Sequence, residues 1–314
     1  MSKKKVGLAL AGGGGKGAYQ IGVWEALRET GLEKYITSVS GTSVGGINAV
    51  LFAQGDLEKA IKVWDNISHD KILSPKNPFM HPSEPFSFFS REGLVKLIDQ
   101  NLDMDIFFQD KRNCWLTCVR LGKKGPESIS PNSAQYSTAN VDYFNLKKAN
   151  KETITNIILA TSAIPVIFPP VGINGQEFVD GGVPFLGGDN IPVAPLRVMD
   201  KCDIVLGIHL EPMDEPIVRR DFEGTRIYEI FPKKSLGSML DFDPDHARQK
   251  RLQGYEETFD LFCNIKKTID SSQEFETKFK TNLEWKKITM REYEALQREF
   301  MELKQQYERL ERGL

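Results

Sequence analysis

Two strand–glycine–helix units near the N-terminus decide the fold: VGLALAGGGGKGAYQ (residues 6–20) and ITSVSGTSVGG (residues 36–46). In each unit an apolar run that predicts a strand passes through glycines into a stretch that predicts a helix, 18–29 in the first and 47–54 in the second. Two consecutive units of this kind favour a parallel sheet with helices on both faces. We therefore predict an α/β fold, a three-layer α/β/α arrangement with a mostly parallel central sheet.

The composition excludes several classes of protein. The chain has 314 residues, of which 40% are hydrophobic, and a formal net charge of −2. It can therefore bury a sizeable core, and it lacks the strongly basic balance of a protein that binds nucleic acid. Its four cysteines form no disulfide framework, and Cys114 and Cys118 have no second Cys or His pair at ligand spacing, so we predict no zinc site.

No stretch of the sequence predicts a leader or a membrane span. The apolar run 6–11 that follows three lysines has only six residues, shorter than the roughly seven to fifteen of a signal peptide. Elsewhere no run approaches the roughly 18 apolar residues of a spanning helix. We expect a cytoplasmic chain that makes at most peripheral contact with the inner face of a membrane.

The middle of the chain predicts further strands and helices. Strands are expected at 114–120, 202–210 and 225–231, a helix at 153–162, and a hairpin at 171–179 that turns at Asn174-Gly175. Ser90 is predicted to cap a helix that carries Leu94, Leu97, Ile98 and Leu102. Before it, residues 74–90 mix four prolines with phenylalanines, which fits either a lid that faces lipid or a cover for the sheet.

The C-terminal part differs in composition from the rest. Residues 266–314 are highly charged and contain no glycine before Gly313. Apolar residues follow a 3-4-3-4-3 spacing at Tyr293, Leu296, Phe300, Leu303, Tyr307 and Leu310. This pattern predicts a helical tail, packed on the domain or forming a seam between copies of the chain in a homo-oligomer.

The first glycine loop, Gly12 to Gly17, literally matches the Gly-x-Gly-x-x-Gly fingerprint of dinucleotide-binding proteins. That fingerprint needs an acidic residue near the end of the second strand, where this chain has Ser40-Gly41-Thr42. A phosphate-binding P-loop would need Lys and then Ser or Thr after Gly17, where this chain has Ala18-Tyr19. A glycine loop before a helix can also hold another anion, including an oxyanion, on its backbone N–H groups.

The second glycine turn carries a candidate nucleophile. Gly41-Thr42-Ser43-Val44-Gly45 matches the nucleophile elbow, in which small neighbours permit the strained backbone that exposes the serine hydroxyl. The alternative is that Ser43 merely caps the following helix. An α/β-hydrolase would need about 100 residues before its serine and a histidine late in the chain. Only 42 residues precede Ser43, and the late histidines, His209 and His246, are interpreted as structural.

A third element, Asp180-Gly181-Gly182, follows the predicted hairpin; taken alone, it is explained better by an Asx-turn than by a functional role. The three motifs in this order resemble those of the patatin-like phospholipase family, over roughly residues 5–260, which we predict to be one domain. Residues 163–170 before the aspartate and 189–193 after it support the resemblance. The run between Gly182 and Asn190 is somewhat longer than is usual in the family.

The resemblance implies a serine–aspartate dyad without a catalytic histidine, and an activity that needs neither a metal nor a cofactor. Ser43 would attack a lipid ester and Asp180 would accept its proton; an unperturbed pKa of about 3.9 is low for this role, so the site is expected to be apolar enough to raise it. The oxyanion would be held by the N–H groups of Gly13, Gly14 and Gly15, with added positive field from Lys16. Supporting positions in the motifs are Gly12, Gly17, Gly41, Gly45, Gly181 and Gly182.

The substrate implied by the resemblance is a lipid or lysolipid. Two other classes of function remain open from the residues alone. One is a nucleotide-binding or dehydrogenase-like module that uses the Gly12–Gly17 loop, and the other is a catalytically silent lipid-binding protein.

Overall fold

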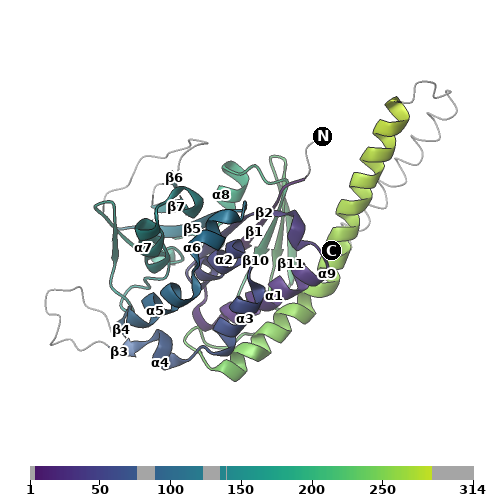
Figure 1. Cartoon of the computed structure of the whole chain (residues 1–314). Helices are drawn as coiled ribbons and strands as arrows, with labels where there is room; N and C mark the ends of the chain where they lie inside the picture. Colours follow the sequence, from purple (N-terminus) through teal and green to yellow (C-terminus); the bar gives the residue numbers. More distant parts are fainter. Residues whose placement is uncertain (1–3, 76–88, 123–134, 139, 285–314) are drawn as a thin grey trace.

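The computed structural model describes residues 4–75, 89–122, 135–138 and 140–284 (Figure 1). Along these residues the chain alternates strands with helices, as the sequence predicts. The helices are α1 (Ala18–Glu29), α2 (Val44–Gln54), α3 (Leu57–Asp65), α4 (His69–Ile72), α5 (Glu92–Asn101), α6 (Met104–Gln109), α7 (Lys151–Thr161), α8 (Val193–Val198) and α9 (Pro244–Glu284).

The main sheet has the order β11-β12-β10-β1-β2-β5-β7-β6, with β8 and β9 attached beside β5. Its five central strands, β12, β10, β1, β2 and β5, are mutually parallel, and the strands at both sides are antiparallel. The strands are β1 (Val6–Leu10), β2 (Ile36–Thr42), β5 (Asn113–Arg120), β6 (Gln135–Ser137), β7 (Val141–Asn145), β8 (Val171–Ile173), β9 (Gln176–Asp180), β10 (Ile204–Ile208), β11 (Ile217–Phe222) and β12 (Thr225–Ile230). A separate pair joins β3 (Ser74–Pro75) to β4 (Phe89–Ser90).

The two faces of the sheet carry two separate apolar cores. Along β1, Leu8 and Leu10 belong to the larger core with α1, α2, α7 and α9, whereas Ala9 belongs to the smaller core with α8. This alternation follows from the two-residue period of a strand, and here both faces are buried because helices cover both. The predicted three-layer α/β/α fold is confirmed.

Helix α9 covers the outer side of α1, and the two helices lie side by side (Figure 1). They approach closely because each has a glycine at the contact. A Cβ on Gly22 would lie 1.7 Å from the Arg251 carbonyl oxygen, and one on Gly254 would lie 2.1 Å from that of Tyr19. The C-terminal helix is therefore part of the packed structure over this length.

Most predicted elements lie where the sequence pattern placed them, including the Asn174-Gly175 turn, whose φ angles are 50° and 79°. The predicted cap of α5 is wrong. Ser90 ends β4, where it pairs with Ser74, so Arg91 occupies the N-cap position. Helix α9 also runs without a break through residues 260–266, where the sequence suggested that the tail begins.

Two predictions concern residues outside the described part of the chain: the lid interpretation of 74–90 for residues 76–88, and the apolar spacing between Tyr293 and Leu310. Among the described residues, none of the helices has the length and apolar character that crossing a membrane requires.

Candidate active site

Ser43 lies on a strained turn between β2 and α2. Its φ of 55° and ψ of −127° are outside the regions that a non-glycine residue usually adopts. The flanking glycines are needed because the backbone folds back on itself here. A Cβ on Gly41 would lie 2.1 Å from the carbonyl oxygen of Gly45, and a Cβ on Gly45 would lie 2.3 Å from that of Leu10. This strained turn from a strand into a helix has the backbone form that a nucleophile elbow requires.

The register of β5 brings Asp180 next to the elbow. Thr42, at the end of β2, pairs with Thr117 of β5. The next residue of β5, Cys118, pairs on the same side with Asp180, because β7 occupies the other side of β5. Along this edge of β5, pairing with β2 ends at Thr42 and pairing with β9 starts at Asp180. Asp180 therefore lies next to Ser43, the residue that follows Thr42.

The carboxyl group of Asp180 is buried and only half satisfied. The residue is 4% exposed, and its Oδ1 accepts a 2.8 Å hydrogen bond from the Gly182 N–H. Oδ2 has no partner of standard hydrogen-bond geometry among the described residues. Burial raises the pKa of Asp180 to about 6, although the neighbouring Ser43 hydroxyl and the Gly182 N–H act to lower it. The expected increase of this pKa is thus present.

Gly181 and Gly182 let the backbone after Asp180 pass through a crowded space. A Cβ on Gly181 would lie 2.3 Å from the Thr117 carbonyl oxygen, and one on Gly182 would lie 2.5 Å from Oδ1 of Asn190. The unusually long run that follows folds back, because the Asp189 N–H donates to the Gly181 carbonyl oxygen at 2.8 Å. The longer loop therefore leaves Asn190 close to the site.

The first glycine loop runs directly against the elbow: a Cβ on Gly12 would lie 2.9 Å from Cβ of Ser43. The N–H groups of Gly13 and Gly14 have no hydrogen-bond partner among the described residues. The prediction of a third free donor is wrong for Gly15, because its N–H donates to the Met239 carbonyl oxygen at 2.7 Å. Two donors remain in the loop for an oxyanion.

The sequence suggested that Lys16 adds a positive field at the loop, but in the structure its charge is opposed. Its buried ammonium group forms an ion pair with the exposed carboxylate of Glu211, which offsets its field at the loop. Gly17 has a packing role, since a Cβ there would lie 2.6 Å from Cγ2 of Val44.

The two late histidines, His209 and His246, have partners other than the dyad. The His209 ring stacks on Phe231 with centroids 4.0 Å apart, and its Nε2 lies 3.5 Å from Glu229. His246 contacts the Asp241 carboxylate at 3.0 Å. Among the described residues, neither ring hydrogen-bonds to Ser43 or Asp180.

The sequence pattern missed Thr161, at the end of α7. Its Oγ1 accepts a 3.1 Å hydrogen bond from the Ser43 N–H and donates one of 2.6 Å to the Thr117 carbonyl oxygen. This side chain ties the elbow to β5. No local signal could have identified it, because it is 118 residues from Ser43 along the chain.

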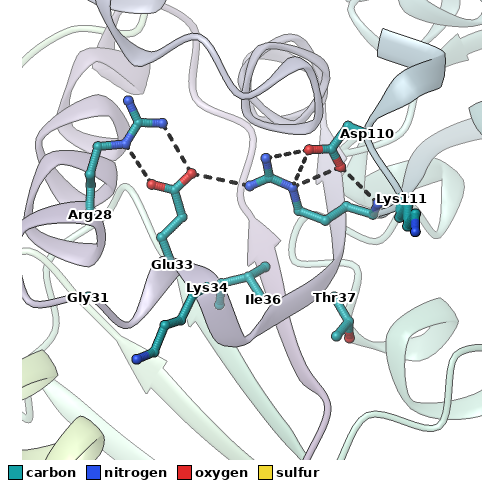
Figure 2. A pocket seen from close by; sticks show the side chains of 9 residues that line it. Arg28, Gly31, Glu33, Lys34, Ile36, Thr37, Asp110 and Lys111 are labelled. Carbon is teal, nitrogen blue, oxygen red and sulfur yellow. Dashed lines mark hydrogen bonds and ion pairs between the residues drawn. The ribbon is translucent and has the colours of Figure 1, made fainter. Parts of the chain in front are cut away.

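A cavity of about 620 Å³ lies at the other end of β2, lined in part by Ile36 and Thr37 (Figure 2). Figure 2 shows Arg28, Glu33 and Asp110 in a network of ion pairs around it. Strand β2 has seven residues, so this cavity and Ser43 are separated by about 20 Å. The cavity is therefore not part of the site at Ser43. Within the described ranges no three His, Cys, Asp or Glu side chains form a group that could hold a metal ion.

A serine on a strand-to-helix elbow of an α/β sheet, with a buried carboxyl group beside it, is typical of serine hydrolases. The family model described as Patatin-like phospholipase matches residues 8–197. The match covers the elbow, the glycine loop and Asp180, and the chain belongs to the patatin-like phospholipase family.

Relatives include uncharacterized NTE family proteins of Mycobacterium tuberculosis and Mycobacterium bovis, 25% identical over 252 residues, which are 79% of this chain. The matched part spans 60% of the length of those relatives. Lysophospholipase nte1 of Aspergillus terreus is 45% identical over 51 residues, 16% of this chain and 3% of that protein.

Similar solved structures include VipD from Legionella pneumophila, with a TM-score of 0.47, 13% identity and coverage of 83% of this chain and 67% of that chain. Human GIVD cytosolic phospholipase A2 is another, with a TM-score of 0.47, 9% identity and coverage of 85% and 60%.

Proposed function

We propose that this chain is a serine lipid acyl hydrolase, of the phospholipase A or lysophospholipase kind, that works through a Ser43–Asp180 dyad. One observation carries the proposal: the buried carboxyl group of Asp180, whose pKa is about 6, has the hydroxyl of the elbow serine as its neighbour and no other partner for Oδ2 among the described residues. Such a carboxylate can accept a proton near neutral pH. Membership of the patatin-like phospholipase family supports a lipid ester as the substrate.

In the first half of the reaction, Ser43 Oγ attacks the ester carbonyl carbon while Asp180 Oδ2 takes the hydroxyl proton. The carbonyl oxygen becomes an oxyanion, which the N–H groups of Gly13 and Gly14 stabilise. When this intermediate collapses, the C–O bond to the leaving alcohol breaks and the alcohol takes the proton from Asp180. The acyl group remains on Ser43.

In the second half, Asp180 takes a proton from a water molecule, whose oxygen attacks the acyl-serine. The same two N–H groups stabilise the second oxyanion. Its collapse breaks the bond to Ser43, returns the proton to the serine oxygen and releases a fatty acid. The dyad is thereby restored, and the cycle consumes one ester and one water.

Apolar side chains exposed around the dyad support a lipid substrate and peripheral contact with a membrane. Val166 and Phe185 lie on the loops that flank Asp180, with 54% and 79% of their surfaces exposed. Met239 and Leu240, beside the glycine loop, are 42% and 39% exposed. Exposed apolar groups gathered around one site favour contact with acyl chains.

Binding to liposomes tests this contact. Phe185→Ser should reduce co-sedimentation with phosphatidylcholine vesicles. Phe222→Ser is the control, because Phe222 is also exposed, at 49%, but lies at the opposite edge of the sheet, paired with Thr225. Equal loss of binding in both variants would contradict a contact surface around Ser43.

A fluorophosphonate probe, which reacts with activated serines, tests the hydrolase itself. The wild-type chain should be labelled and should release fatty acid from a lysophospholipid, and Ser43→Ala should do neither. Ser68→Ala is the control, since the Ser68 side chain makes no hydrogen bond to the described residues. A folded wild-type chain that is not labelled would instead support a silent lipid-binding protein.

A further inference from the structure

The glycine loop is anchored at both ends by side chains from distant parts of the chain. At one end, the Gly12 N–H donates to Asn190 Oδ1 at 3.2 Å, and Asn190 Nδ2 donates to the Gly12 carbonyl oxygen at 3.3 Å. At the other end, the Gly15 N–H donates to the Met239 carbonyl oxygen, and the Gly15 carbonyl oxygen accepts from Lys250 Nζ at 3.2 Å. The N–H and the carbonyl oxygen of Gly15 are thus both hydrogen-bonded to residues that follow β12 in the chain.

Lys250 uses its ammonium group entirely within this anchor. The residue is 6% exposed and lies in the second turn of α9. Besides Gly15, Nζ donates to the carbonyl oxygen of Asp241 at 3.3 Å and to Asp241 Oδ2 at 2.9 Å. The three N–H donors of the ammonium group thus have three acceptors. The side chain links the start of α9, the loop before it and the glycine loop.

The Asp241 carboxylate completes the anchor. His246 contacts it at 3.0 Å from the exposed side. Although burial acts to raise the pKa of Asp241, the hydrogen bonds from Lys250 and His246 lower it to about 2, so this carboxylate is ionised at any working pH. The ion pair that orients Lys250 therefore persists throughout the range in which Asp180 titrates.

The two unpaired donors lie between the two anchors. Gly14 has a φ of +55°, which only glycine adopts readily, and a Cβ there would lie 2.1 Å from the Met239 carbonyl oxygen. This segment has no side chains of its own to hold it in place. Its conformation depends on one bond within the loop, from the Lys16 N–H to the Gly13 carbonyl oxygen at 3.2 Å, and on Asn190 at one end and Met239 and Lys250 at the other.

We propose that Lys250 is a positioning residue for the oxyanion loop: by holding the Gly15 carbonyl oxygen, it aims the N–H groups of Gly13 and Gly14 at the ester attacked by Ser43. The inference rests on the proposed function, because it assigns Lys250 a part in the same reaction. Lys250 lies outside residues 8–197, the part that the family model matches. Donors aimed in advance at the developing charge contribute mainly to kcat, because the charge exists only in the transition state.

The experiment compares Lys250→Met, which keeps the length of the side chain and removes its donors, with Lys266→Met, a lysine of the same helix that pairs with Asp270. In Lys250→Met, kcat for a lysophospholipid should fall by about 10- to 100-fold with little change in KM. Lys250→Arg keeps donors at the end of the side chain and should lose less. Lys266→Met should match the wild-type chain in both constants.

Amide hydrogen exchange supplies a readout that does not depend on activity. In Lys250→Met the peptide that contains residues 12–18 should exchange faster, while peptides from β5 and β10 keep their wild-type rates. Faster exchange throughout the chain would mean that Lys250 only stabilises the fold, and would overturn the proposal. If Lys250→Met does not fold, Asp241→Asn removes the ion pair but keeps the Asp241 carbonyl oxygen, and it should give the same local effect more weakly.

Two different failures are distinguishable. If the wild-type chain is neither labelled by a fluorophosphonate nor active on lipid esters, the proposed function fails, and hydrogen exchange still decides whether Lys250 anchors the loop. If the wild-type chain is active and folded Lys250→Met retains its kcat, the positioning role of Lys250 is refuted while the hydrolase stands.

Discussion

The carboxyl groups at the two ends of strand β2 differ in their pairing and in the direction in which their pKa values are shifted. At its carboxyl end, Asp180 is buried without a cationic partner and with no hydrogen bond of standard geometry to Oδ2 among the described residues, and burial raises its pKa to about 6. At its amino end, the carboxylates of Glu33 and Asp110 are paired with arginines around the cavity of Figure 2. There burial also acts to raise the pKa values, but hydrogen bonds from Arg28 and Arg112 outweigh it and lower them.

This difference separates a site for chemistry from a site for stability. A paired carboxylate is stabilised in its charged form and is a weak base, whereas a buried and partly unpaired one holds a proton more readily. The strained backbone of Ser43 lies at the carboxyl end of β2, and the unpaired N–H groups of Gly13 and Gly14 lie next to it, in the loop that follows β1. These groups lie where the proposed reaction takes place, whereas the cavity at the opposite end of β2 is lined by paired charges.

The largest expected effect comes from removing the base. Asp180→Asn should lower kcat by about 10²- to 10⁴-fold, because the amide cannot accept the proton of Ser43. Asp110→Asn, at the opposite end of β2, should leave kcat unchanged. Steady-state hydrolysis of a lysophospholipid at pH 8 measures both. Equal activities of the two variants would remove the distinction between the two ends.

The same pair of variants should shift stability in opposite directions. The pKa of Asp180 is higher in the folded chain than its ordinary value of 3.8, so folding takes up a proton between about pH 4 and pH 6 and stability falls as the pH rises through this window. At pH 8 the buried charge costs about 3 kcal/mol. Asp180→Asn should therefore raise the free energy of unfolding at pH 8 by up to that amount and change it little at pH 4.

Asp110→Asn should instead lower the free energy of unfolding by about 0.5–1 kcal/mol at pH 8. The pKa of Asp110 is lowered by folding, so its contribution exists above its ordinary pKa and is lost as the pH falls. Urea unfolding at both pH values measures the two variants. If Asp180→Asn destabilised the chain at pH 8, the ionised Asp180 side chain would not be destabilising in the wild-type fold, contrary to the prediction.

Glycines at the two ends offer a third comparison. Gly41→Ala should destabilise the chain by about 1–3 kcal/mol, because its Cβ would meet the Gly45 carbonyl oxygen at 2.1 Å. Gly31→Ala, beside the cavity, has φ of +71° but only the end of the Lys266 side chain nearby, so it should cost about 1 kcal/mol. Thermal unfolding ranks the two, and the reverse order would show that the elbow tolerates a side chain.

The last comparison concerns the pH dependence of the wild-type chain. Because Asp180 must be ionised to accept a proton, kcat should fall about tenfold for each pH unit below about pH 6. Burial lowers the pKa of His209 below 6.5, so His209→Ala is the necessary control. A profile whose acid limb disappears in folded His209→Ala or His246→Ala would indicate a catalytic histidine.

Much of the local structure was predictable. The elbow at Ser43, the Asn174-Gly175 turn and the central strands follow from preferences for φ, from glycine spacing and from apolar runs, all of which act between near neighbours. The error at Ser90 had a distant cause, since its backbone pairs with Ser74 instead of starting a helix. Thr161 was missed because its role depends on a contact across the fold.

By itself, the sequence determined which residues can form an elbow, a glycine loop and a tight turn after an aspartate, because these need only small neighbours and particular backbone angles. The tertiary structure decided the rest. Pairing of β9 beyond the end of β2 places Asp180 beside Ser43, burial raises its pKa, and Met239 takes the N–H of Gly15. Burial and long-range hydrogen bonds depend on residues far away in the chain, and spacing along the sequence carries no record of them.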